Sequence, residues 1–120
     1  MRALFDSNIL IDYLNGIAPA KAELARYKRP AISMITWIEV LVGATAETES
    51  ITRSFLSAFE RVEVTAAIGE MAVLIRRESG LRIPDAIILA TARVHEAVLW
   101  TQDADFAGLK GVRYFQKNQS

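Results

Sequence analysis

The stretch Ala3-Leu4-Phe5-Asp6-Ser7-Asn8-Ile9-Leu10-Ile11 places a polar triplet between two apolar runs. Its first three residues are typical of a short buried strand, and Ser7–Leu14 is predicted to form the helix that follows. Asp6 therefore lies where hydrophobic burial should be tightest. Its carboxylate can cap the helix that begins at Ser7, an interaction worth about 1 kcal/mol, or it can belong to a chemical site.

Strand-like and helical segments alternate along the rest of the chain. Further strands are predicted at Ala31–Ser33, Val62–Val64, Ala97–Trp100 and, at an edge, Val112–Phe115. Further helices are predicted at Pro19–Tyr27, after Ser33 through Gly43, and at Thr48–Phe59, Ala66–Ser79 and Pro84–Glu96. This alternation predicts an α/β fold, a three-layer sandwich with a short, mainly parallel sheet flanked by helices. The tail from Lys117 is expected to be frayed.

Composition limits the class of protein. The 120 residues suit one domain, residues 1–120, and 52% of them are hydrophobic. Lys+Arg and Asp+Glu are balanced at 14 each, so the chain lacks the overall positive charge that would indicate nucleic-acid binding. The chain has no cysteine, no signal-peptide pattern and no apolar run approaching the roughly 20 residues of a membrane span. We therefore expect a soluble, cytoplasmic protein without membrane contact.

Four acids occupy comparable junctions between predicted elements: Asp6, Glu39, Asp85 and Asp103. In a parallel α/β sheet, strand carboxyl ends and the helix N-termini that follow them converge on one rim. Carboxylates gathered there would repel one another unless a cation were bound. Oxygen ligands without cysteine favour Mg²⁺, or Mn²⁺, over Zn²⁺. The chemistry that follows most naturally is metal-assisted phosphodiester hydrolysis.

Each of these acids also has a purely structural interpretation. Asp85 follows Pro84 and can complement a helix dipole. Glu39 can form a capping box with Thr36, unless the helix begins nearer Ser33. Asp103 and Asp105 are ordinary turn residues when taken singly. What favours a site is the shared rim, which independent caps need not produce.

Four motifs in this order resemble the PIN-domain family: Asp6-Ser7-Asn8, Ser33 with Thr36 and Glu39, Ile83-Pro84-Asp85-Ala86, and Thr101-Gln102-Asp103-Ala104-Asp105-Phe106. More narrowly, the chain is similar to VapC-type toxin ribonucleases. The resemblance implies a Mg²⁺-dependent endoribonuclease that a cognate antitoxin holds inactive.

The same resemblance assigns roles to residues. It implies an acidic quartet of Asp6, Glu39, Asp85 and Asp103 that binds metal and catalyses, with Asn8 and Thr101 orienting the acids through hydrogen bonds. Either Asp103 or Asp105 can be the fourth acid of this quartet, and we favour Asp103. A homodimer and a short antitoxin tail over the acid rim are also expected.

An RNA substrate requires local positive charge, for which Arg76, Arg77, Arg82 and Arg93 are the candidates. Single-stranded or looped RNA is favoured, because side chains cannot read the narrow A-form major groove. Trp37 and Trp100 are expected to pack in the core rather than to stack on bases.

Other classes fit less well. A phosphoacceptor receiver domain needs an aspartate after its third strand, where this chain has Thr65-Ala66-Ala67. A haloacid-dehalogenase-like phosphatase needs a second aspartate at the position of Asn8. A Ser-His-Asp site could use only His95, the single histidine. The remaining alternative is a catalytically inactive PIN-like module that acts by binding RNA or a partner.

Overall fold

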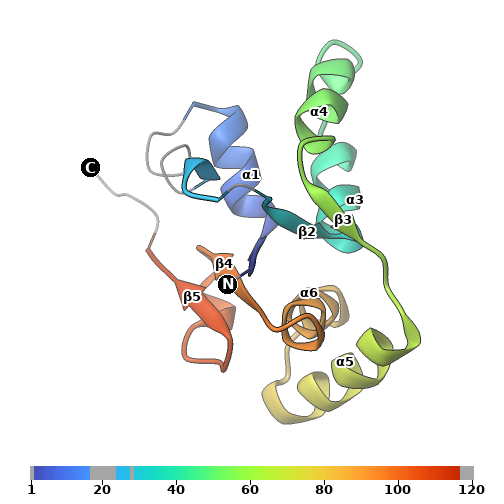
Figure 1. Ribbon diagram of the computed structural model, residues 1–120, viewed down its shortest axis with the longest axis vertical. Coiled ribbons are helices and arrows are strands. Elements are labelled where there is room, and N and C mark those ends of the chain that lie inside the picture. The colour runs from blue at the N-terminus through green and yellow to red at the C-terminus, as the bar shows by residue number, and fades with distance from the viewer. Residues whose placement is uncertain (1, 17–23, 28, 117–120) are drawn as a thin grey trace.

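The computed structural model describes residues 2–16, 24–27 and 29–116, which form a parallel sheet flanked by helices (Figure 1). In chain order the elements are β1 (Arg2–Phe5), α1 (Ser7–Leu14), β2 (Ala31–Ser33), α3 (Met34–Val42), α4 (Glu49–Leu56), β3 (Glu60–Val62), α5 (Ala66–Ser79), α6 (Ile83–Val94), β4 (Ala97–Thr101), the 3-10 helix η1 (Ala104–Phe106) and β5 (Val112–Tyr114). Within these ranges, no helix has both the length and the apolar character needed to cross a membrane.

The sheet has the strand order β3-β2-β1-β4-β5, and every neighbouring pair is parallel. β1 and β4 lie in register, with Leu4 opposite Leu99 and Phe5 opposite Trp100. These central strands therefore end side by side, which brings the residues after Phe5 next to those after Trp100. The predicted α/β class with a parallel sheet is confirmed, and β5 is the edge strand that was expected.

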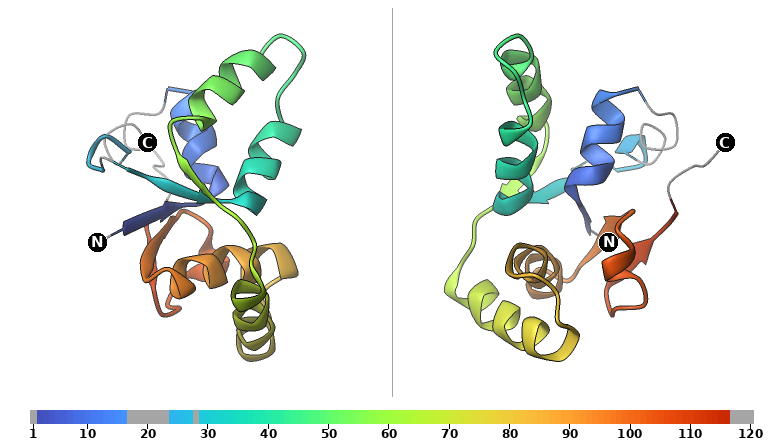
Figure 2. Two further views of the ribbon diagram at one scale, coloured as in Figure 1. Left: turned by 45° about the vertical axis from the view of Figure 1, so that its right-hand side comes forward. Right: turned by 180° about the vertical axis from the view of Figure 1, so that it is seen from behind.

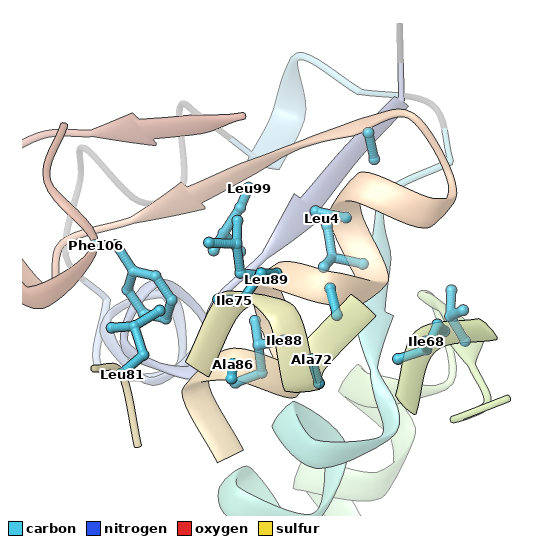
Figure 3. Close-up of a cluster of buried hydrophobic side chains, with 14 of the residues drawn as sticks. Leu4, Ile68, Ala72, Ile75, Leu81, Ala86, Ile88, Leu89, Leu99 and Phe106 are labelled. Atoms are coloured by element: carbon cyan, nitrogen blue, oxygen red, sulfur yellow. The ribbon is translucent and has the colours of Figure 1, made fainter. Parts of the chain in front are cut away.

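The sheet is the middle of three layers (Figure 2). Side chains alternate along β1, so that Ala3 and Phe5 join the cluster packed under α1, α3 and α4. Leu4 points to the opposite face and joins the cluster formed with α5 and α6, where Leu99 from β4 also packs (Figure 3). Because both faces are covered, the inner strands β1, β2 and β4 consist mainly of buried apolar residues, whereas the edge strands β3 and β5 each carry an exposed arginine.

The third strand was predicted two residues too late. β3 is Glu60–Val62 rather than Val62–Val64, because it pairs with β2 from Ala31 opposite Glu60 to Ser33 opposite Val62. Beyond Ser33 the neighbouring chain turns into α3, so Val64 has no strand to pair with and is exposed. The partner strand, rather than local propensity, therefore sets where β3 ends.

Two helix boundaries also differ from the sequence-based prediction. α4 covers Glu49–Leu56 rather than Thr48–Phe59, because tighter turns after Leu56 return the chain to the sheet, where the Glu60 N–H bonds the Pro30 carbonyl at 2.9 Å. α6 begins one residue before Pro84 and ends at Val94, because Glu96 takes a left-handed conformation with φ 53°. The helix predicted at Pro19–Tyr27 lies mostly outside the described residues, as does the tail from Lys117.

Candidate functional site

Asp6 is a buried carboxylate at the carboxyl end of β1, with 4% of its surface exposed. Its Oδ1 accepts a hydrogen bond from the Ser7 N–H at 2.8 Å, and its Oδ2 accepts one from Thr101 Oγ1 at 2.7 Å. Asp6 is the N-cap of α1, so the capping role predicted for it is present. The second oxygen is held by β4, which a cap alone does not require. Two elements thus fix this side chain at the rim of the sheet.

Thr101 connects two of the predicted acids. It is the last residue of β4, one residue beyond the predicted end of this strand at Trp100, and its side chain is fully buried. Its Oγ1 donates to Asp6 and accepts from the N–H of Asp103 at 3.0 Å. Asn8 Oδ1 accepts from the Gln102 N–H at 3.3 Å and so holds the same loop against α1. Thr101 therefore contacts a carboxylate directly, whereas Asn8 contacts the backbone that carries one.

Two helix N-termini bring the other acids to the same rim. The N-cap of α3 is Ser33, whose Oγ accepts from the Ile35 N–H at 3.0 Å. Glu39 therefore lies in the second turn of α3, too far along for a capping box with Thr36, and that interpretation is wrong. Asp85 lies in the first turn of α6, where its charge also complements the helix dipole.

The four acids line one pocket of about 250 Å³. Its lining residues are Asp6, Ser7, Asn8, Glu39, Arg82, Pro84, Asp85 and Asp103. The structure thus brings together all four acids that the sequence places at distant junctions. Among these lining residues Arg82 is the only cation, so the pocket carries a strong excess of negative charge.

Asp105 lies beside this pocket rather than in its lining. Asp103 caps η1 through its Oδ1, which accepts from the Asp105 N–H at 2.9 Å. One carboxylate oxygen from each of Asp85, Asp103 and Asp105 can lie within 4.8 Å of the other two. Asp103 faces the pocket and Asp105 extends the acidic cluster toward solvent, so both are placed to assist a bound cation.

The surroundings of Asp6 oppose its ionisation. Burial is the main reason that the pKa of Asp6 is raised, and repulsion from Glu39 and Asp103 adds to it. Hydrogen bonds from Thr101 and the Ser7 backbone favour the ionised form and offset part of this increase in pKa. The carboxylate is therefore held in place by donors while its charge is left uncompensated.

The pKa values of Glu39 and Asp85 are raised as well. Burial is the largest cause for both, and the nearby carboxylates add repulsion. Arg82 partly opposes the increase at Asp85, and a hydrogen bond from the Ser7 side chain opposes it at Glu39. Sequence reasoning treated Ser7 only as the start of a helix. Its position directly after Asp6 was the available signal that it would face the same pocket.

The donor set of this pocket fits a hard divalent cation. Carboxylate oxygens are the ligands that Mg²⁺ and Mn²⁺ prefer. Asp6, Glu39 and Asp85 have raised pKa values because their ionised forms are destabilised, and a bound cation would relieve that destabilisation. Among the described residues, Asp85, Asp103 and Asp105 are the acids close enough together to share one ion. Asp6 and Glu39 line the same pocket as Asp85 and Asp103 and are the other carboxylates that could hold it.

The structure distinguishes among the arginines that were candidates for phosphate contacts. Arg76 donates to two backbone carbonyls that follow α5, at 2.7 and 2.8 Å. Arg93 donates from Nε and Nη2 to the Lys110 carbonyl, at 3.0 and 2.9 Å. Both therefore stabilise the fold, whereas Arg82 lines the acid pocket. Arg77 lines a different pocket, between α5 and α6.

The family model for the PIN domain matches residues 3–112, which is nearly the whole chain. The chain belongs to this family. The resemblance drawn from its motifs is confirmed.

Several solved structures of toxin-antitoxin proteins contain chains similar to this one. The chain is 45% identical to a chain of a toxin-antitoxin complex from Klebsiella pneumoniae, with a TM-score of 0.90 over 96% of this chain and 99% of that one. DNA-bound VapBC from Salmonella typhimurium is 19% identical, with a TM-score of 0.80 over 97% and 98% of the two chains. VapBC2 from Rickettsia felis, bound to a promoter DNA fragment, is 22% identical, with a TM-score of 0.69 over 98% and 100%. A comparison with curated proteins gives no match.

Proposed function

We propose that this protein is a Mg²⁺-dependent endoribonuclease and the toxin of a toxin-antitoxin pair. The observation that carries the proposal is the pocket in which Asp6, Glu39, Asp85 and Asp103 converge. Membership of the PIN domain family supports nuclease chemistry at that pocket. Mn²⁺ is expected to substitute for Mg²⁺, because both ions prefer oxygen ligands.

A divalent cation in this pocket would supply Lewis-acid activation of a phosphodiester and of the attacking water. The residues of the chain position the reaction. Asp6 is fixed by its two hydrogen bonds, so it presents its carboxylate without losing side-chain entropy at the moment of binding. Thr101 sets the distance between Asp6 and the loop that carries Asp103.

Arg82 is the group best placed to bind the substrate phosphate. It lines the acid pocket, and its fixed charge attracts an anion that the surrounding carboxylates repel. Single-stranded or looped RNA is the substrate class that we propose, because an exposed backbone can enter a pocket at the edge of a sheet without a groove being read.

We also propose two protein partners. A chain 45% identical to this one is part of a toxin-antitoxin complex, which supports an antitoxin whose tail covers the acid rim. A second copy of the chain is the other partner. Exposed apolar side chains on α3, α5 and the start of α6 favour this homodimer: Ile38, Val42, Val73, Leu74 and Ile83. A stable monomer at micromolar concentration in sedimentation velocity would count against the homodimer.

Cleavage of a labelled single-stranded RNA by the purified protein tests the proposed activity. Wild type should cleave with Mg²⁺ and lose cleavage with EDTA, and Asp6→Asn and Asp85→Asn should cleave at least a hundredfold more slowly. Glu70→Gln is a matched control, because Glu70 is an exposed acid on α5 outside the pocket. It should cleave like wild type.

Two results would decide against the proposal. Equal cleavage by wild type and both pocket variants would exclude the acids from catalysis and point to a contaminating nuclease. RNA binding without cleavage under any metal condition would instead favour the inactive PIN-like module. Parallel reactions with single-stranded DNA of the same sequence test the substrate class.

A further inference from the structure

A second pocket lies along the edge strand β3, between α3 and α4, and has a volume of about 310 Å³. Buried Leu56 and Phe59 provide its apolar lining, and Trp37 contributes an aromatic wall. Trp100 is buried as the sequence predicted, but Trp37 is only partly buried. Trp37 packs against the core cluster, as expected, and its indole also lines this pocket, where it is available to a ligand.

Two arginines lie against this indole. The Cζ atom of Arg61, on β3, is 4.8 Å from the centroid of the Trp37 ring, and that of Arg53, on α4, is 5.7 Å from it. Both are cation–π distances, and both arginine side chains are about half exposed. An aromatic face flanked by two guanidinium groups combines stacking with anion binding in one pocket.

The arginines keep most of their donors. Arg53 uses Nε to pair with Glu49 at 2.9 Å, and Arg61 uses Nε to pair with Glu63 at 3.5 Å. Within the part of the chain that the structure describes, no hydrogen bond engages the Nη groups of either arginine. Such exposed ion pairs are worth about 0 to 1 kcal/mol, so a phosphate can share or replace them at little cost.

The pocket lies beyond the outer side of α3 as seen from the acid pocket. Trp37 and Glu39 are two residues apart on this helix, which places them about 200° apart around its axis. Exposed Ile38 lies on the helix surface between them. β3 is two strands away from β1, or about 10 Å. α3 and α4 lie together over the edge of the sheet that ends in β3 (Figure 2), so an extended RNA strand held at the acid pocket reaches the second pocket within a few nucleotides.

We propose that Trp37, Arg53 and Arg61 form a nucleotide-binding subsite for single-stranded RNA, a few nucleotides from the cleaved bond. The proposal rests on the proposed ribonuclease function and extends it. A base stacks on the Trp37–arginine group, and the adjoining phosphate accepts hydrogen bonds from the guanidinium groups. The subsite supplies the positive and aromatic surface that the acid pocket, with Arg82 as its only lining cation, lacks.

The chemistry of the pocket favours RNA over a peptide. Two planar cations against one indole suit a base and its adjoining phosphate, although apolar Leu56 and Phe59 and one acid, Glu63, also line the pocket. Base stacking on an aromatic side chain tolerates every base, so the subsite strengthens RNA binding without reading the sequence. Sequence preference would then arise at the acid pocket.

Binding is measured without cleavage, so that the result does not depend on the proposed activity. The dissociation constant of a fluorescently labelled single-stranded RNA is determined by anisotropy in EDTA for wild type and for Arg53→Gln/Arg61→Gln, whose altered side chains are exposed. We expect the double variant to bind about tenfold more weakly and with a shallower salt dependence. Wild-type tryptophan fluorescence should fall on RNA addition, and this quenching should be lost in Trp37→Phe if stacking on the indole causes it.

Arg113→Gln is the matched control, because Arg113 also lies over an indole, 5.1 Å from the Trp100 ring centroid, but outside this pocket. Its RNA affinity should equal that of wild type. In cleavage assays the double variant should raise the KM for a long RNA but leave dinucleotide cleavage unchanged. Unchanged RNA affinity in the double variant would overturn the subsite and leave the pocket to a protein partner. Absent cleavage by wild type would instead refute only the proposed activity.

Discussion

Replacing Thr101 with valine tests the central link in the acid pocket. The substitution keeps the shape of a fully buried side chain but removes its hydroxyl. The hydrogen bond to Asp6 Oδ2, at 2.7 Å, has a carboxylate acceptor and is worth about 1.5 to 3 kcal/mol when ionised. The bond from the Asp103 N–H, at 3.0 Å, adds about 0.5 to 1.5 kcal/mol. We therefore expect Thr101→Val to lower the free energy of unfolding by about 2 to 4.5 kcal/mol.

This loss should depend on pH in a defined direction. The Thr101 hydroxyl donates to the ionised form of Asp6 and so lowers the pKa of that carboxyl. Without the hydroxyl, the pKa of Asp6 rises further above its ordinary value. The difference between wild type and variant is therefore largest at high pH, where Asp6 is ionised in wild type, and shrinks as both forms become protonated.

Urea denaturation followed by circular dichroism, in metal-free buffer at about pH 8 and at a series of lower pH values, measures both effects. Thr91→Val is the matched control, because Thr91 is equally buried but its hydroxyl donates to a neutral carbonyl, that of Ile87, at 2.8 Å. Thr91→Val should lower the free energy of unfolding by about 1 kcal/mol or less at every pH. The reasoning is refuted if Thr101→Val costs no more than Thr91→Val at about pH 8, or if its cost does not decrease as the pH is lowered.

Three further predictions follow from the same contacts. The pKa values of Asp6, Glu39 and Asp85 are raised in the folded state. Their contribution to the stability of the metal-free fold is therefore complete below about pH 4 and is lost as the pH rises through their folded-state pKa values. As the pH rises, the Tm of metal-free wild type should therefore fall more steeply than that of Asp85→Asn. Mg²⁺ should raise the Tm of wild type more than that of Asp85→Asn. Equal slopes of Tm against pH for the two proteins would contradict this reasoning. Arg82→Gln should raise the KM for RNA about tenfold in steady-state kinetics, while Arg77→Gln should not, because Arg77 lines another pocket. Glu96→Gly should raise the free energy of unfolding by about 0.5 to 1 kcal/mol in urea, because Glu96 has φ 53°, and no gain would indicate that its conformation is unstrained.

The fold and the convergence of the four acids on one rim could be predicted, because both follow from local sequence patterns. Short apolar runs mark buried strands, and a parallel sheet brings the residues after those strands to one rim, whatever their separation in the sequence. The position of Asp6 after Ala3-Leu4-Phe5 therefore sufficed to place it. The end of β3 could not be predicted in this way, because it is set by pairing with β2 rather than by its own residues.

Interactions between distant segments were the other features that the sequence did not reveal. The in-register pairing of β1 with β4 is what brings the Thr101 hydroxyl to Asp6, 95 residues away. Arginine roles were equally hidden, since Arg76 and Arg93 are tied to backbone carbonyls while Arg82 faces the acid pocket. Composition identifies a guanidinium group, but only the fold determines which acceptors lie within its reach.

The acid pocket couples folding to cation binding. Each carboxyl whose pKa is raised makes the metal-free fold less stable at neutral pH than an unperturbed acid would. A ligand that binds only the folded state stabilises it by RT ln(1 + [L]/Kd), about 2.7 kcal/mol at a hundred times Kd. The capping bond of Asp6 and its bond from Thr101 hold the carboxylate in place whether or not a cation is bound. The same contacts that explain Asp6 as a helix cap therefore also keep the site open and preorganised, so that cation binding offsets repulsion without first having to order the side chain.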